Sequence, residues 1–302
     1  MRTWAEYLAF LGLKSFFFVF PRSWCLALGR SLGTLAFHLD RRRRGIALGN
    51  LRTAFGGEKS PAELRAIARD SFRRFGQVMT DIFKLFPFDR AKIEDLVTVE
   101  GWENLTNAIA LGKGVLVFSA HIGNWELGSL MISRAVKLNV VARALDNRLM
   151  EAELVRFRRR LGAHVIYKQQ AARKVLQALK NGEAVAILVD QNVLRVQAIF
   201  VDFFGRPAGT TPALGAFALR TGAPLVPVYC LPIASGRYRL KILPRPAIVL
   251  DGDVETNVLK ITQTCTKIIE KEIRENPGSW LWFHDRWRSR PKEEHDHQDQ
   301  TP

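Results

Sequence analysis

The stretch Val115-Leu116-Val117-Phe118-Ser119-Ala120-His121-Ile122-Gly123-Asn124-Trp125-Glu126 holds an apolar run, a short break and the start of a second segment. The run Val115–Ser119 has the length and apolarity of a buried strand, whereas residues 124–136 have helical spacing. Gly123 gives the chain between them the freedom to turn. The stretch therefore predicts a strand, a turn and a helix, which is the repeating unit of α/β folds.

The same alternation of short apolar runs and helical stretches continues along the chain. The further strand-like runs are Val140–Ala144, His164–Tyr167, Ala184–Val189, Ala198–Phe204, Leu225–Leu231 and Tyr238–Leu243. The helical stretches are 60–86, 147–161, 170–181, 211–221 and 254–275. Strands separated by helices favour a parallel sheet. We predict an α/β domain over residues 56–292, with a mixed, largely parallel sheet flanked by helices.

Residues 1–55 differ in character from that domain. The segment from Trp4 to Leu39 is rich in Phe, Leu and Trp, but charged residues interrupt it and Pro21 divides it. The run Arg41–Arg44 follows. Apolar helices beside an arginine cluster are typical of a segment that lies on an anionic membrane surface. The alternatives are a core hairpin with a solvated basic turn, or a weak single span. Residues 293–302 are polar, and we expect a frayed tail.

Composition limits the classes of partner. The chain has 302 residues and a formal net charge of +16, with 31 Arg against 14 Lys. Such a charge favours polyanions: nucleic acid, anionic lipid or an acidic carrier protein. Arginine also favours forked recognition of phosphate or carboxylate. The three cysteines are widely spaced, so neither a disulfide framework nor a zinc site is expected.

His121 and Glu126 are the first candidates for chemistry, because the ends of parallel strands are where α/β sheets place their sites. Five residues correspond to about 140° of rotation in a continuous helix, so the two side chains meet only if a turn separates them. A histidine held by a carboxylate has a fixed tautomer and acts as a better general base. We therefore expect a pair between His121 and Glu126.

An ordered set of motifs resembles the lipid A late acyltransferases, which belong to the HxxxxD/E group of membrane acyltransferases. The motifs are Leu39-Asp40-Arg41-Arg42-Arg43-Arg44, Asn50-Leu51, the His121–Glu126 stretch, Arg143 with Asp146-Asn147, Val189-Asp190-Gln191, Val201–Ala208, Gly222–Val228 and Trp280–Trp287. The resemblance extends over about residues 20–292.

The resemblance implies transfer of a fatty acyl chain from acyl-acyl carrier protein to a hydroxyl of a lipid A precursor, without a cofactor. It implies a glycerolipid-acyltransferase-like fold and a place on the cytoplasmic face of the cell inner membrane. The implied catalytic residues are His121, Glu126, Arg158 and Asp190. Arg159 and Arg160 compete with Arg158 for the functional arginine, and the candidates for substrate binding are Arg143, Asn147 and Arg160. No metal site is implied.

Other functions remain open at this point. An arginine-rich module on nucleic acid lacks any helix-turn-helix, zinc-finger or RNA-binding motif, so we expect no nucleic-acid partner. A metal-dependent hydrolase using His121 and Glu126 lacks further ligands at workable spacing. Within acyl transfer, another glycolipid or a lysophospholipid is the alternative acceptor. No Gly-x-Ser-x-Gly motif is present, which favours direct transfer over a serine acyl-enzyme.

Overall fold

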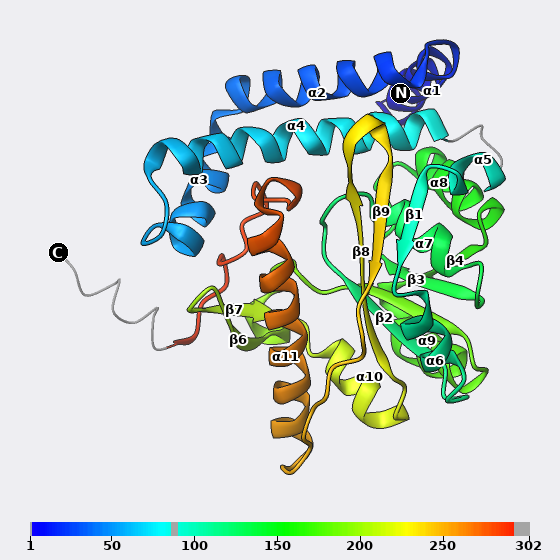
Figure 1. The fold of residues 1–302 in the computed structure, drawn as a ribbon, viewed down its shortest axis with the longest axis vertical. Helices are drawn as coiled ribbons and strands as arrows, with labels where there is room; N and C mark the ends of the chain where they lie inside the picture. Colours follow the sequence, from blue (N-terminus) through cyan, green and yellow to red (C-terminus); the bar gives the residue numbers. More distant parts are fainter. Residues whose placement is uncertain (1, 86–89, 293–302) are drawn as a thin grey trace.

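The computed structural model describes residues 2–85 and 90–292, so the tail expected over 293–302 lies outside the described residues. A seven-stranded sheet has the order β1-β9-β8-β2-β5-β3-β4, with β9 antiparallel to β8 and the other neighbours parallel. Its strands are β1 (Val97–Glu100), β2 (Val115–Ser119), β3 (Leu138–Ala142), β4 (Ala163–Tyr167), β5 (Ala184–Leu188), β8 (Leu225–Pro232) and β9 (Tyr238–Ile242). The mixed, largely parallel α/β fold is therefore confirmed (Figure 1).

Alternating side chains of the central strands divide the core into two layers, because successive residues of a strand point to opposite faces. In β2, Leu116 and Phe118 pack with α9, α10 and α11, whereas Val115 and Val117 pack with α7 and α8. The helices that follow the N-terminal layer are α5 (Arg90–Glu94), α6 (Trp102–Ile109), α7 (Trp125–Ile132), α8 (Arg148–Arg160), α9 (Ala171–Lys180), α10 (Ala213–Thr221) and α11 (Val254–Glu275). Both faces of the sheet are thus covered, as a parallel sheet requires.

Four N-terminal helices form a separate layer along one end of the sheet (Figure 1). They are α1 (Arg2–Val19), α2 (Arg22–Leu39), α3 (Arg41–Phe55) and α4 (Pro61–Leu85). Pro21 separates α1 from α2, and α4 lies along α2. No helix in the part of the chain that the structure describes combines the length and apolarity needed to span a bilayer.

Arg22 of α2 ties this layer to the sheet through a buried carboxylate. Its guanidinium donates two hydrogen bonds to Asp81 of α4, at 2.7 and 2.6 Å. The hydroxyl of Tyr238 in β9 donates to the same carboxylate at 2.8 Å. Asp81 is fully buried, so these three hydrogen bonds offset the free-energy cost of removing its charge from water.

The hairpin of β6 (Ile199–Phe203) and β7 (Arg206–Thr210) lies outside the main sheet. The prediction that the Ala198–Phe204 run is a strand of the main sheet was therefore wrong. Phe204 and Gly205 connect the two strands, and both have positive φ, at 57° and 74°. This is the backbone of a tight two-residue hairpin turn. Strands β1 and β7 and helix α6 were not expected from the sequence. Their patterns are short, and β7 contains Pro207 and Gly209.

Close contact between α2 and α4 depends on glycine. A Cβ added to Gly33 would lie 2.1 Å from the carbonyl oxygen of Phe72, and one added to Gly76 would lie 2.2 Å from that of Gly29. The two backbones therefore approach too closely for any side chain at these positions.

We predict that Gly33→Ala lowers the free energy of unfolding by about 1–3 kcal/mol, because the helices must separate to admit the methyl group. Gly49→Ala is the matched control, since Gly49 is an exposed residue of α3 and a Cβ added there meets no atom within 4 Å. That substitution should raise stability by up to about 1 kcal/mol through helix propensity. Equal denaturant midpoints for the two variants would show that the helix contact is not as close as described.

Candidate active site

His121 lies in the turn between β2 and α7, as the sequence predicts. The helix begins at Trp125, and the Asn124 side chain caps it by accepting a hydrogen bond from the amide of Leu127 at 3.2 Å. Gly123 has a φ of 61°, and a Cβ there would lie 2.1 Å from the carbonyl oxygen of Cys230. The turn is thus packed tightly against β8, which fixes His121 at the carboxyl end of the sheet.

The carboxylate that contacts His121 belongs to Asp190. Asp190 follows β5, the parallel neighbour of β2, so the two residues meet at the same edge. His121 Nδ1 lies 2.9 Å from Asp190 Oδ1, and the backbone amide of His121 donates to Oδ2 at 2.9 Å. The indole Nε1 of Trp280 donates to Oδ2 at 2.7 Å. A buried carboxylate is therefore held by donors from two distant segments.

These contacts fix the chemistry of the imidazole. Burial alone raises the pKa of Asp190, but the charge of His121 and the donated hydrogen bonds outweigh burial and hold that pKa at about 2. An ionised carboxylate only accepts hydrogen bonds, so Nδ1 of His121 carries the proton in the neutral ring. Nε2 is then the basic nitrogen, and the Gln191 amide nitrogen lies 3.4 Å from it.

Glu126 has a different partner, which corrects the expected pair with His121. Arg158 Nε donates to Glu126 Oε2 at 3.0 Å, and Arg158 Nη2 donates to Oε1. Burial would lower the pKa of Arg158, but the charge of Glu126 outweighs it and raises that pKa. Because residue 126 belongs to the first turn of α7, its side chain is carried away from His121 toward α8.

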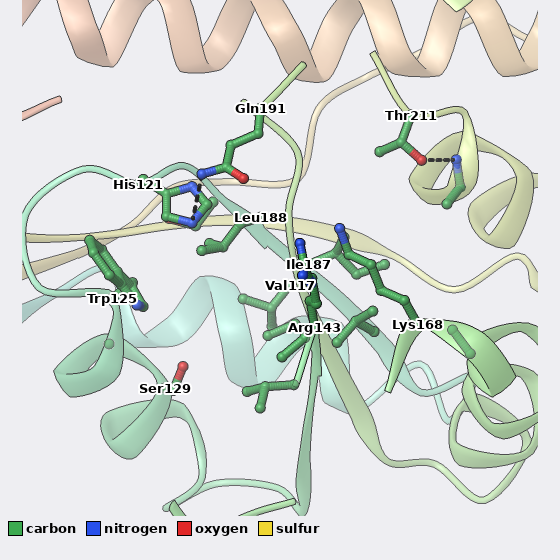
Figure 2. A pocket seen from close by; sticks show the side chains of 18 of the residues that line it. Val117, His121, Trp125, Ser129, Arg143, Lys168, Ile187, Leu188, Gln191 and Thr211 are labelled. Atoms are coloured by element: carbon green, nitrogen blue, oxygen red, sulfur yellow. Dashed lines mark hydrogen bonds between the residues drawn. The ribbon is translucent and has the colours of Figure 1, made fainter. Parts of the chain in front are cut away.

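A cavity of about 640 Å³ opens beside these groups, within the range of pockets that bury a small molecule. Figure 2 shows His121 and Trp125 on its wall, with Arg143 and Lys168 further along. His121, Glu126 and Arg158 are partly buried polar groups in its lining. The apolar part of the lining includes Val117, Ile132, Leu138, Val140, Ile187 and Phe217. The cavity thus has an apolar wall that can pack against a long apolar chain and polar side chains that can contact a polar reacting group.

This combination of fold and site agrees with the protein family that the sequence matches. The family model for the bacterial lipid A biosynthesis acyltransferases matches residues 1–289. The chain belongs to this family. It is therefore an acyltransferase, which confirms the resemblance drawn from the motifs.

Curated relatives of the acyltransferase include two enzymes of Escherichia coli strain K12. The lipid A biosynthesis palmitoleoyltransferase is 30% identical over 266 residues, which is 87% of this chain and 85% of the relative. The lipid A biosynthesis lauroyltransferase is 27% identical over 88% of this chain and 85% of the relative. A phosphatidylinositol mannoside acyltransferase of Mycobacterium tuberculosis (strain CDC 1551 / Oshkosh) is 25% identical over 72% of this chain and 69% of the relative.

The three residues proposed for substrate binding have different surroundings. Arg143 lines the cavity with an exposed side chain that donates to Asp146 at 2.9 Å. Asn147 is buried outside the cavity lining, where it caps α8 and donates to the carbonyl oxygen of Thr3. Arg160 is exposed and lies over the ring of Phe157, also outside the lining. Of these three residues, only Arg143 lines the cavity. Asn147 and Arg160 instead contact other parts of the protein.

Several residues at the site were missed in the sequence. Gln191, Lys168 and Ser129 line the cavity, and Trp280 contacts Asp190. Gln191 follows Asp190, and the strand end was its signal. Trp280 belongs to the C-terminal aromatic motif, but nothing in that motif shows which tryptophan reaches the carboxylate. The choice among the three arginines is clearer in the structure, because Arg158 lines the cavity whereas Arg159 and Arg160 are exposed.

We predict that Arg158→Lys lowers the turnover number by about 10²-fold, because lysine keeps the charge but loses the fork that holds Glu126 and faces the cavity. Arg159→Lys and Arg160→Lys are the matched controls and should stay within twofold of the wild type. Steady-state kinetics of acyl transfer measure all three. A larger defect in either control would reassign the functional arginine, and a rise in KM alone would limit Arg158 to docking a phosphate.

Proposed function

We propose that the protein transfers a fatty acyl chain from acyl-acyl carrier protein to a hydroxyl group of a lipid A precursor, with His121 as the general base. The observation that carries this proposal is the pair of His121 and buried Asp190 beside an apolar cavity. In this proposal the acyl carrier is a substrate, and the reaction uses no cofactor.

The geometry of the imidazole supports a specific sequence of proton transfers. Nε2 of His121 takes the proton of the acceptor hydroxyl as its oxygen bonds to the thioester carbonyl carbon. The tetrahedral intermediate then breaks its carbon–sulfur bond, and the imidazolium returns the proton to the departing thiolate. Asp190 keeps Nδ1 protonated throughout and stabilises the positive ring. Arg158, a partly buried cation of the cavity wall, is the candidate to stabilise the oxyanion.

Direct transfer between bound substrates fits the nucleophiles that are present. Cys230 lines the cavity, but burial raises the pKa of its thiol, and a thiol is a poor nucleophile. Cys25 and Cys265 are buried elsewhere. An attack by the acceptor hydroxyl itself therefore needs fewer assumptions than an acyl-enzyme.

The acceptor is the less constrained part of the proposal. The relatives named for lipid A biosynthesis support a lipid A precursor, and the relative named for phosphatidylinositol mannoside supports another glycolipid as the alternative. An acidic carrier protein complements a chain of net charge +16. Arg143 and Lys168 give the cavity two exposed cations that suit phosphate groups of either substrate.

We further propose that the protein lies on the cytoplasmic face of the inner membrane through α1 and α2. These helices expose many large apolar side chains: Trp4, Leu8, Leu13, Phe16, Phe18, Val19, Trp24, Leu32, Leu35 and Leu39. Exposed large apolar side chains in such number are typical of a surface that contacts lipid or protein. Arg41, Arg42 and Arg43 are exposed beside it, whereas Arg44 donates to the last carbonyl groups of α2.

We predict that Trp24→Ser with Leu35→Ser weakens binding to vesicles of phosphatidylglycerol and phosphatidylethanolamine by at least tenfold, since each lost apolar contact is worth about 1.5 kcal/mol or more. Val249→Ser with Leu250→Ser is the control, because both side chains are exposed on another segment. Vesicle co-sedimentation measures the difference. Equal binding of the two variants would place the membrane contact elsewhere.

We predict that His121→Ala and Asp190→Asn each lower the turnover number at least about 10²-fold, the usual contribution of a positioned general base. His164→Ala, an exposed histidine on β4, should leave it unchanged. The assay combines purified protein, acyl-acyl carrier protein and a lipid A precursor, with product detection by mass spectrometry. Full activity of His121→Ala would refute the base. Transfer to a lysophospholipid but not to the precursor would reject the proposed acceptor.

A further inference from the structure

The buried carboxylate of Asp190 receives one hydrogen bond that no part of the proposed reaction uses. Trp280 Nε1 donates to Oδ2 at 2.7 Å, and Asp190 and Trp280 are both almost completely buried. The same oxygen accepts from the His121 backbone amide, whereas Oδ1 faces the imidazole. The indole and the His121 amide together hold Oδ2, which leaves Oδ1 directed at the imidazole.

The indole is itself held from several directions. Ser71 of α4 donates its hydroxyl to the Trp280 carbonyl oxygen at 2.5 Å. Trp280 pairs with Ile122 through an isolated β-bridge, which ties it to the turn that carries His121. Its ring packs edge-on against Phe203 and Trp282, at centroid distances of 5.6 and 4.6 Å. Backbone contacts thus hold the Trp280 main chain and aromatic contacts hold its ring, in a position where the N–H donates to Asp190.

We propose that Trp280 is a positioning residue for acyl transfer: its indole N–H orients Asp190, and Asp190 in turn holds the His121 ring with Nε2 directed to the substrate. This inference rests on the proposed role of His121 as the base. It assigns a function to one tryptophan of the C-terminal aromatic motif, and that function is electrostatic as well as spatial.

Removing the indole N–H changes the basicity of the Asp190 carboxylate in a predictable direction. The indole stabilises the ionised form of Asp190, so its loss leaves a more basic carboxylate that holds the proton of the imidazolium more tightly. Among the described residues, the titratable groups that interact with Asp190 include His121, His284, Arg286 and Tyr229. A substitution at Trp280 leaves these side chains unchanged, and replacement by an isostere that lacks the N–H separates the lost hydrogen bond from any change in burial.

Three buried tryptophans of the same segment make a controlled comparison. Trp280 donates to Asp190, Trp282 donates to the carbonyl oxygen of Pro277 at 2.7 Å, and Trp287 Nε1 has no hydrogen-bond partner among the described residues. Trp280→Phe therefore removes the hydrogen bond to Asp190. Trp282→Phe removes a hydrogen bond away from the site, and Trp287→Phe removes an N–H that makes no hydrogen bond to any residue that the structure describes.

The test is the kinetics of Trp280→Phe, Trp282→Phe and Trp287→Phe in the full-length protein, with the pH dependence of kcat/KM. For Trp280→Phe we expect kcat to fall about tenfold, the size of a hydrogen bond to a charged group, with KM unchanged. The acid limb of its profile should move to higher pH. The other two variants should keep the wild-type kcat and profile. A normal kcat and profile in folded Trp280→Phe, or the same defect in all three variants, would overturn the proposal.

Two further measurements keep the result clear. Replacement of Trp280 by 3-benzothienylalanine keeps the bicyclic shape and lacks the N–H, so it should reproduce the kinetic defect even if the phenylalanine variant is unstable; wild-type kinetics would contradict the inference. Adding Trp280→Phe to Asp190→Asn should change kcat less than twofold, and a further tenfold loss would contradict a role through Asp190. If Asp190→Asn and His121→Ala are themselves active, the proposed chemistry fails instead.

Discussion

The ionised carboxylate of Asp190 is the constraint around which the active site is arranged. A charge that is removed from water must be compensated by hydrogen bonds and opposite charge, or the fold loses several kcal/mol. Here the compensation comes from the turn after β2 and from the C-terminal segment, while Asp190 itself follows β5. Three segments that are far apart in the sequence must therefore meet before the carboxylate can be buried. The same requirement fixes the tautomer of His121, so the stability of the site and the reactivity proposed for it have a common origin.

The N-terminal helices contribute to this arrangement as well as exposing apolar surface. Ser71 of α4 bonds to the backbone of Trp280, and Asn50 of α3 donates to the carbonyl oxygens of Trp282 and His284. The C-terminal segment is thus clamped between the helical layer and the sheet. The layer is held in turn by Asp81, which joins α2, α4 and β9. A surface proposed to lie on a membrane is consequently continuous, through packed and hydrogen-bonded elements, with the residues proposed to react.

Much of the fold could be predicted from local patterns. The strand, turn and helix around His121 follow from the apolar run Val115–Ser119 and from Gly123, and α4 follows from the helical spacing of residues 60–86. The hairpin of β6 and β7 could not be predicted in the same way. Its turn needs positive φ at Phe204, a conformation that a sequence gives no reason to expect from phenylalanine.

The residues proposed as catalytic lie near one another, but the pair expected between His121 and Glu126 was wrong. His121, Glu126, Arg158 and Asp190 do gather at one end of the sheet, yet the sequence does not say that β5 lies beside β2, so the Asp190 contact was not foreseen. Spacing along the chain favoured Glu126 as the partner of His121, whereas in the folded protein Glu126 pairs with Arg158. Asn147 is a second example. It belongs to a motif of the family, but in the structure it caps α8 and donates a hydrogen bond to α1.

The state of the His121 ring tests the account most directly. Nitrogen-15 NMR of the imidazole, in protein labelled at histidine and compared with His121→Ala for assignment, distinguishes the two ring nitrogens at a pH where the enzyme is active. The account predicts a proton on Nδ1, with a downfield proton resonance that Asp190→Asn abolishes, and an unprotonated Nε2. A neutral ring with its proton on Nε2, or a spectrum that Asp190→Asn leaves unchanged, would contradict it.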